Sequence, residues 1–217
     1  NKFIFIDGED DNHIETKYSN KGLYFKRELL SEDHRIKPIS FAIPKSKILK
    51  EIDYHPKNIL APLIPGRLNT YIYDNERSYY EMYKKSIFAL TYKKAGWDCL
   101  RHYEILMNGC IPLFLDVENC PKKVITTLPK GKLIDLLNDF NYIFSYYNPF
   151  KIFKKKHLTF QRMFNSLKLN FKSYNLENFI EENERVFELK KELLNFTKKN
   201  LTTETLAKYT LDCFKEQ

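Results

Sequence analysis

The sequence of 217 residues has no glycine-rich phosphate-binding signature. Its six glycines form neither a GxGxxG pattern nor a GxxxxGK pattern followed by serine or threonine. Both patterns bring backbone N–H groups up to the phosphates of a nucleotide at the start of a helix. Their absence disfavours the usual dinucleotide-binding and P-loop classes.

Residue types that commonly carry catalysis or bind metals are few and dispersed. The four cysteines, Cys99, Cys110, Cys120 and Cys213, contain no CxxC pair, and the five histidines lack the spacing of zinc ligands. No serine or cysteine lies in a nucleophile elbow. Free thiols inside apolar runs behave as small hydrophobic groups, so a reduced, cytoplasmic setting is expected.

Long hydrophobic runs are also missing. None approaches the roughly 18 residues that would cross a bilayer, so no transmembrane segment is expected. An apolar run follows Asn1 almost at once, with no charged segment and cleavage site before it, and we expect the chain to be a fragment. A hydrophobic fraction of 43% and an aromatic fraction of 15% are sufficient for a folded core.

The chain carries a formal net charge of +8, with 36 Lys and Arg residues against 28 Asp and Glu residues. Such an excess suits nucleic acid, an anionic membrane surface or an anionic small substrate. The lysines are spread out, however, and only residues 153–157 form a short basic block. A lysine- and asparagine-rich surface that keeps the protein in solution is the favoured interpretation, and no nucleic-acid partner is expected.

The hydrophobic pattern predicts strands that alternate with helices. In the first part, short apolar strands are expected within residues 2–7, 22–29 and 38–43, and prolines interrupt a linker or crossover at 45–66. Strands are then expected at 87–92, 110–116 and 141–147, and helices at 75–86, 97–109, 119–128, 129–139, 177–200 and 202–214. Alternation of this kind favours βαβ units with a parallel sheet.

We therefore predict an α/β protein with a Rossmann-like parallel sheet, a partial second lobe and a helical C-terminal region. Residues 1–57 are assigned to the partial N-terminal lobe and linker, 58–147 to the Rossmann-like lobe, and 148–217 to a helical region that packs on both. No internal repeat or low-complexity tract divides the chain further.

One segment, residues 93–116, combines apolar flanks with chemically useful side chains. Gly96 follows a predicted strand, and Asp98 stands where it could cap the next helix. Arg101 and Glu104 are three residues apart on that helix and so share one face. An arginine there could bind phosphate oxygens, and a glutamate could accept hydrogen bonds from sugar hydroxyls. Ligands of open α/β sheets collect at this end of the strands.

The same spacing has a purely structural interpretation. A capped amphipathic helix with an Arg–Glu pair on its surface needs no ligand, and such a pair adds only about 0.3 kcal/mol to stability. Spacing alone leaves the two interpretations equally open.

Residues 71–116 nevertheless resemble the donor-binding lobe of GT-B fold glycosyltransferases, especially the exostosin-like ones. The resemblance rests on four features. They are the passage from a helix into a strand between Tyr83 and Phe88, the glycine at Gly96, the Arg101-x-x-Glu104 pattern on the next helix, and the Gly-Cys-Ile-Pro sequence that starts at Gly109. Residues 201–211 are similar to the terminal helix of such proteins, whereas the first 65 residues match poorly. Only part of an N-terminal lobe fits before the linker.

The resemblance implies a metal-independent transfer of a sugar from a nucleotide-sugar donor to an acceptor hydroxyl, on a glycan or polysaccharide, with no cofactor. It implies that Arg101 holds the diphosphate and that Glu104 holds a ribose or donor-sugar hydroxyl. Trp97 and Asp98 would shape the loop. Arg67, Asn69 and Thr70 are further candidates on the phosphate side.

Residues 7–12, with the sequence DGEDDN, form an acidic loop after the first predicted strand. Paired carboxylates could hold Mn²⁺, as Asp-x-Asp motifs do in GT-A enzymes, but a polar turn is the favoured interpretation and no metal is expected. Asp7 is the candidate general base, with His13 as the alternative. The rival hypothesis for the whole chain is a non-catalytic nucleotide-fold module that binds a polyanion or a protein through its basic surface.

Overall fold

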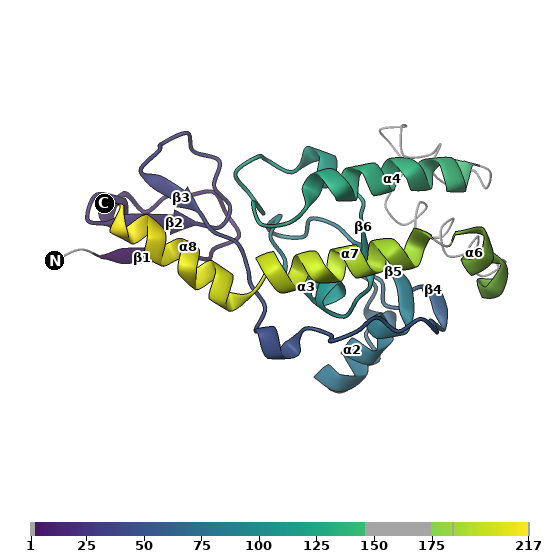
Figure 1. Cartoon of the computed structure of the whole chain (residues 1–217). Helices are drawn as coiled ribbons and strands as arrows, with labels where there is room; N and C mark the ends of the chain where they lie inside the picture. The colour runs from purple at the N-terminus through teal and green to yellow at the C-terminus, as the bar shows by residue number, and fades with distance from the viewer. Residues whose placement is uncertain (1–2, 146–174, 184, 217) are drawn as a thin grey trace.

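A computed structural model describes residues 3–145, 175–183 and 185–216. The described chain forms two separate three-stranded sheets, both entirely parallel. The N-terminal sheet has the order β1-β2-β3, and the C-terminal sheet has the order β4-β5-β6. Figure 1 shows the two sheets at opposite ends of the molecule. This arrangement confirms the α/β class.

The N-terminal sheet contains β1 (Ile4–Asp7), β2 (Leu23–Lys26) and β3 (Ile36–Pro38), with the short helix α1 (Thr16–Ser19) between the first two strands. All four residues of β2 are buried, because the strand lies between its two neighbours. Leu23 and Phe25 pack on one face of the sheet, and Tyr24 packs on the other. This alternation is the two-residue period of a strand.

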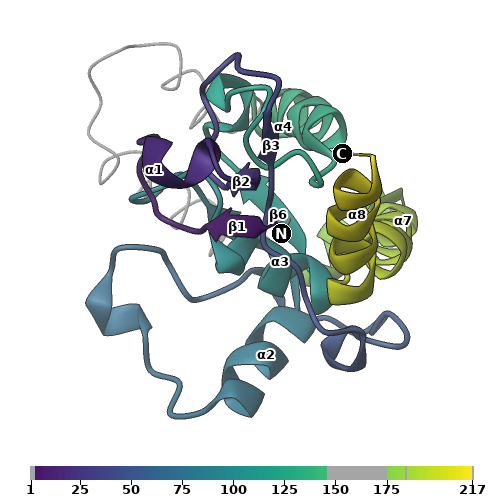
Figure 2. The ribbon, with the colours of Figure 1, turned by 90° about the vertical axis from the view of Figure 1, so that its left-hand side faces the viewer.

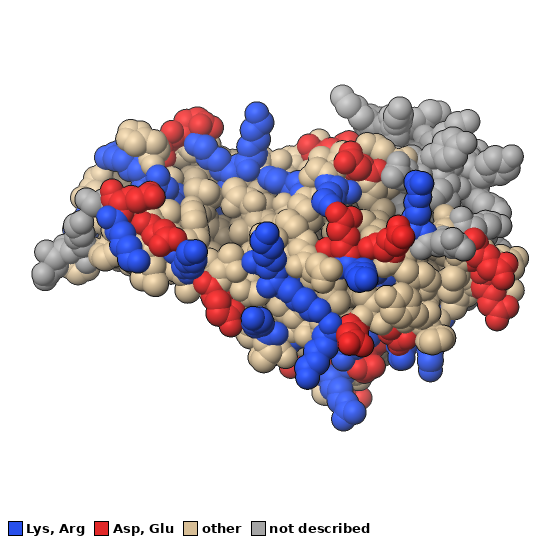
Figure 3. All heavy atoms as spheres, in the orientation of Figure 1, with Lys and Arg blue, Asp and Glu red and all other residues tan. Residues whose placement is uncertain are grey.

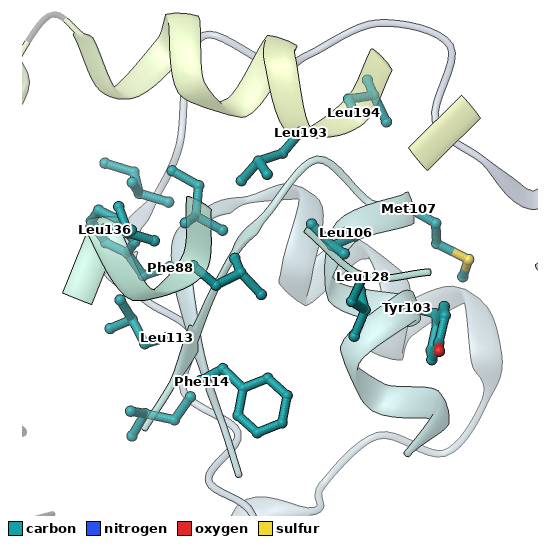
Figure 4. Packing of buried hydrophobic residues seen from close by; sticks show 14 of the residues in the cluster. Phe88, Tyr103, Leu106, Met107, Leu113, Phe114, Leu128, Leu136, Leu193 and Leu194 are labelled. Atoms are coloured by element: carbon teal, nitrogen blue, oxygen red, sulfur yellow. The ribbon is translucent and has the colours of Figure 1, made fainter. Parts of the chain in front are cut away.

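The C-terminal sheet contains β4 (Asn58–Leu60), β5 (Ser86–Thr91) and β6 (Ile111–Phe114). Helix α2 (Glu76–Lys84) connects the first two strands, and α3 (Leu100–Met107) connects the last two. Every residue of β5 is buried, as expected for the central strand of a parallel sheet that is covered on both faces. Figure 4 shows how Phe88 of β5 and Phe114 of β6 lie in the same core as Leu106 of α3.

Two long helices complete this core. Helix α4 (Lys130–Ser145) contributes Leu133 and Leu136, and α7 (Arg185–Asn200) contributes Leu193 and Leu194. The shorter α6 (Leu176–Glu182) adds Phe179. Three single 3₁₀ turns, η1 (Lys45–Lys47), η2 (Leu68–Thr70) and η3 (Val117–Asn119), lie in the connections.

The C-terminal helix α8 (Thr203–Lys215) returns to the N-terminal sheet, so α7 and α8 together run along both halves (Figure 1). Figure 2 shows α8 lying beside the β1-β2-β3 sheet at the end of the molecule that carries both termini. Its side chains of Leu206, Cys213 and Phe214 pack against Leu23 and Phe25. The Thr202 hydroxyl accepts a hydrogen bond from Thr205 N (3.1 Å) and caps the helix, as the sequence predicts.

Several predicted elements need correction. Residues 120–128, in the segment expected to be a helix at 119–128, form turns and bends. Pro121 and Pro129 flank residues 122–128, and Ile125 has a left-handed φ of 49°. Residues 141–145 continue α4 and are not a strand, while 146–147 lie outside the described residues. The helix expected at 177–200 is divided into α6 and α7. The linker at 45–66 contains β4, which is too short to give a hydrophobic pattern.

The four cysteines are free thiols. Among the helices that the structure describes, none has both the length and the apolar character needed to cross a bilayer.

Candidate functional site

The loop that follows β5 lies against the N-terminal half of the molecule. A Cβ atom at Gly96 would lie 2.6 Å from Glu28 Oε1 and 3.0 Å from Asp10 Oδ1. Glu28 is itself buried, and its Oε1 accepts a hydrogen bond from Asp98 N (2.8 Å). Glycine is therefore needed at position 96 because the chain that follows β2 approaches the loop so closely.

Asp98 does not cap α3, contrary to the sequence-based expectation. The N-cap of α3 is Cys99, which makes no side-chain capping bond. The Asp98 carboxylate is buried and accepts hydrogen bonds from Phe41 N (2.8 Å) and from the Tyr103 hydroxyl (2.7 Å). Burial raises the pKa of Asp98 to about 6, although both hydrogen bonds and nearby Arg27 act in the opposite direction.

Arg27 links this loop to the acidic loop after β1. Its guanidinium is buried and donates to Gly8 O (2.9 Å), to the backbone oxygen of Asp98 and to the Asp10 carboxylate. Its carbon Cζ also lies 4.7 Å from the centre of the Phe41 ring. Arg27 is not among the site residues that the sequence predicts. The available signal was the charged Lys-Arg-Glu sequence that directly follows the apolar residues of the second predicted strand.

His102 fixes the other side of the loop. This fully buried ring is stacked on Phe114, with 4.2 Å between ring centroids. Its Nδ1 lies 2.7 Å from Thr91 Oγ1, and its Nε2 lies 2.9 Å from Trp97 O. Burial lowers the pKa of His102 to about 4, so the ring is neutral near pH 7. Since a carbonyl can only accept, Nε2 carries the hydrogen and donates to Trp97.

Gly96, Trp97 and Asp98 are thus brought together in a loop that is tied to both halves of the protein. The backbone oxygens of all three residues, the Asp98 backbone N and the Asp98 carboxylate make hydrogen bonds within the protein. The indole of Trp97 is partly exposed, and Lys93 Nζ lies 5.2 Å from its ring centre. These contacts fix the loop that leads into α3.

Arg101, in the first turn of α3, has an incompletely paired guanidinium. Its Nη2 donates to the Tyr71 hydroxyl (3.0 Å). Its Nε and Nη1 are enclosed by protein, yet neither has a hydrogen-bond partner among the described residues. An enclosed donor without a partner costs about 1–3 kcal/mol, and more when the group is charged. Such a group calls for an explanation, and a missing anionic ligand is one.

Glu104 lies one turn further along α3 and is also partly buried. Its Oε2 accepts a hydrogen bond from the Tyr79 hydroxyl of α2 (2.9 Å), and the Tyr79 and Tyr83 hydroxyls are 3.1 Å apart. Burial raises the pKa of Glu104 above its ordinary value, although the Tyr79 bond and the Arg101 charge oppose the rise. The second oxygen, Oε1, remains available as an acceptor for a ligand.

A cavity of about 310 Å³ opens beside Glu104, between α3, the start of α2 and the segment that precedes α2. Its size lies at the lower end of the range for small-molecule sites. The lining combines aromatic and acidic side chains, namely Leu63, Tyr71, Tyr73, Asp74, Asn75, Glu76, Tyr79, Tyr80 and Glu104. Apart from Glu104, the sequence-based site contains none of these residues, because their proximity depends on the packing of α2 against β5.

Thr70 and Arg67 lie in the turn before this cavity. The Thr70 hydroxyl donates to Arg67 O (2.7 Å) and accepts a hydrogen bond from Ile64 N (3.0 Å). It therefore closes the turn, which leaves the hydroxyl occupied. Arg67 is partly exposed, and its backbone N donates to Ile64 O (3.1 Å).

Asp7 and His13, the candidate bases, lie in the N-terminal half. The Asp7 carboxylate receives hydrogen bonds from the Tyr24 hydroxyl, from Lys26 Nζ (2.9 Å) and from Glu9 N (3.0 Å). Burial alone would raise the pKa of Asp7, but these donors hold it below the ordinary value. A carboxylate stabilised in this way is a poor general base. His13 is exposed, with Nε2 3.6 Å from Glu15.

Two further carboxylates of the acidic loop, those of Asp10 and Asp11, are paired with buried cations. Asp10 contacts Arg27, and Asp11 Oδ1 lies 3.4 Å from Lys26 Nζ. Within residues 3–145, 175–183 and 185–216, no three His, Cys, Asp or Glu side chains are arranged to hold a metal ion.

No known protein family, curated protein or solved structure matches this chain significantly.

Proposed function

We propose that the C-terminal sheet and α3 form the donor-binding lobe of a glycosyltransferase, which moves a sugar from a nucleotide-sugar to an acceptor hydroxyl. The observation that carries the proposal is that Arg101 and Glu104 lie three residues apart on α3 beside one cavity. Glu104 lines that cavity, and so does Tyr71, to which Arg101 Nη2 donates a hydrogen bond. Among the described residues, nothing hydrogen-bonds to the enclosed Nε and Nη1 of Arg101 or to Oε1 of Glu104. A nucleotide-sugar presents phosphate oxygens next to sugar hydroxyls, which matches this order of donor and acceptor.

In the proposed complex, Arg101 binds the diphosphate. Its Nε and Nη1 are covered in the unliganded protein, so the phosphate must displace a neighbour. Tyr71 is the best candidate for displacement, because its side chain is 42% exposed and a single hydrogen bond joins its hydroxyl to Arg101. A charge-assisted bond to phosphate would replace that bond with a stronger one.

During transfer, the bond between the sugar and the diphosphate breaks and negative charge develops on the leaving phosphate. A fixed guanidinium beside that phosphate stabilises the charge as it develops. Glu104 would hold a hydroxyl of the sugar or ribose and so set the orientation of the donor. Asp98 and His102 would act indirectly, because they hold the loop and the first turn of α3 in place.

The rival hypothesis of a polyanion-binding module requires a continuous basic surface. On the face shown in Figure 3, Lys and Arg side chains lie among Asp and Glu side chains and form no such surface. That distribution favours the nucleotide-sugar proposal over the rival for this face of the molecule.

A thermal-shift screen over nucleotide-sugars, with and without Mn²⁺, tests the proposal. We expect at least one nucleotide-sugar to raise the melting temperature, and we expect Arg101→Ala and Glu104→Gln to abolish or reduce that rise. Arg77→Ala is the matched control, because Arg77 is exposed on α2. Retention on heparin with no response to any nucleotide-sugar would instead support the rival.

A further inference from the structure

Three acidic residues line the cavity beside α3. Asp74 and Glu76 come from the start of α2 and the segment before it, and Glu104 comes from α3. Ionised carboxylates only accept hydrogen bonds. They therefore suit the hydroxyl or ammonium groups of a ligand, which donate.

The positive charges near the cavity do not balance these carboxylates once a phosphate is bound. Lys47 Nζ contacts Glu76, which also accepts from the Tyr80 hydroxyl (2.9 Å). Asp74 has no ion-pair partner among the described residues. The other nearby cation is Arg101, whose charge a bound phosphate would neutralise. Two of the three carboxylates then remain without a compensating charge.

We propose that this cavity receives the sugar ring of the donor and selects it by charge. A neutral or ammonium-bearing sugar is accepted, and a sugar that carries a carboxylate is rejected. The inference rests on the proposed function, since Arg101 must take the phosphate for the ring to reach the cavity. The aromatic lining fits the same ligand class, because tyrosine faces pack against the C–H groups of sugars and attract ammonium groups.

The size of the selectivity follows from like-charge repulsion in a partly enclosed site. Placing a carboxylate beside Asp74 and Glu104 brings like charges together in a medium less polar than water. Like-charge contacts at binding sites cost enough to weaken binding by about tenfold or more. A hydroxymethyl group at the same place meets no such penalty and can donate to Glu104 Oε1.

Three sugar 1-phosphates test the inference without any assumption about the nucleotide. Glucose 1-phosphate, glucosamine 1-phosphate and glucuronic acid 1-phosphate are titrated by ligand-observed NMR against the whole chain. We expect glucosamine 1-phosphate to bind at least as well as glucose 1-phosphate, and glucuronic acid 1-phosphate to bind at least about tenfold more weakly. Each Kd is measured at one pH and one ionic strength.

Two variants assign the selectivity to the cavity. Glu104→Gln keeps an acceptor for Tyr79 and removes one charge, so the ratio of the glucuronate and glucose Kd values should fall by at least about threefold. Asp74→Asn, at an exposed position, should reduce the ratio in the same direction and serves if the first variant is unstable. Asp135→Asn, exposed on α4, is the control and should leave the ratio unchanged.

Equal binding of the three sugar phosphates, or preference for the glucuronate, would overturn the inference. So would a failure of all three to bind while a nucleotide-sugar still raises the melting temperature, because the ring would then lie outside the cavity and the proposed function would stand. If neither the sugar phosphates nor any nucleotide-sugar binds, the proposed function itself is wrong.

Discussion

Arg101 combines a cost to stability with a potential gain in binding. Its enclosed Nε and Nη1 have no hydrogen-bond partner within the part of the chain that the structure describes. An apolar group of similar length could fill the same space without that penalty. A residue kept at such a cost is typical of a binding site, where the missing partner is the ligand. Replacing Arg101 should therefore raise the stability of the protein and weaken the binding of the ligand.

Replacing Arg101 by methionine tests the expected gain in stability. We expect the free energy of unfolding to rise by about 1–3 kcal/mol, because the incompletely paired guanidinium is removed and the packing of its stem is retained. Denaturant titration provides the measurement. Arg77→Met, at an exposed position on α2, should change stability by no more than about 0.5 kcal/mol. A destabilised Arg101→Met variant would show that the guanidinium is satisfied in the free protein.

Asp98 and His102 should make opposite contributions to the pH dependence of stability. The raised pKa of Asp98, about 6 against 3.8, means that its contribution is lost as pH rises from about 4 to about 6. The lowered pKa of His102, about 4 against 6.5, means that its contribution is lost as pH falls over nearly the same interval. Each is worth roughly 3 kcal/mol at 1.4 kcal/mol per pH unit, so the two largely cancel.

Single replacements should separate the two titrations. Between about pH 4 and pH 6.5, the free energy of unfolding of Asp98→Asn should rise with pH by roughly 3 kcal/mol more than that of the parent protein. His102→Gln should show the opposite difference. Urea titrations at several pH values provide both slopes. If the slopes of both variants match the parent slope, the two groups have ordinary pKa values and the loop is more hydrated than its burial indicates.

At the scale of elements, the loop after β5 depends on contacts with the chain that follows β2. Gly96→Ala should lower the free energy of unfolding by about 1–3 kcal/mol, because the new Cβ would displace the Glu28 side chain from its bond to Asp98. Gly8→Ala is the control, since a Cβ there meets nothing within 4 Å. Equal stabilities of the two variants, measured by chemical denaturation, would mean that Glu28 is free to move.

Local patterns were sufficient to predict the elements of the C-terminal half that carry the site. The apolar runs at β5 and β6, and the helix α3 ending before Gly109, are where the sequence places them. Gly109 has a φ of +66°, the left-handed conformation that ends a helix. These features depend on neighbours close in sequence. β4 and the division between α6 and α7 depend on packing and could not be predicted.

The site was predictable only in part for the same reason. The three-residue spacing of Arg101 and Glu104 reveals a shared helix face, but it cannot show which other elements face it. The cavity exists because α2 brings Tyr79 to Glu104, and Arg27 reaches Asp98 across a separation of 71 residues. Contacts between residues so far apart in the sequence produce no periodic pattern. The sequence therefore shows Asp98 only as a polar residue before a helix, which is why it was predicted to cap α3.

At the scale of the whole molecule, α8 covers the N-terminal sheet from the end of the chain. A chain that ends at Leu201 should lose roughly 2–4 kcal/mol of stability in that sheet, because Leu206 and Phe214 no longer cover Leu23 and Phe25. Hydrogen exchange should then accelerate at least about tenfold in β2 and much less in β5. A chain that ends at Lys215 is the control. Uniform acceleration in both sheets would show that they unfold as one unit.

The central claim is that Arg101 binds the phosphate of a nucleotide-sugar at the cavity that Glu104 lines. Isothermal titration calorimetry of the nucleotide-sugar that gives the largest thermal shift, against the parent protein and Arg101→Met, tests it most directly. Because the variant is expected to be folded and more stable, a change in affinity cannot be attributed to unfolding. We expect Kd to increase at least about tenfold in the variant. An unchanged Kd would mean that Arg101 does not bind the phosphate.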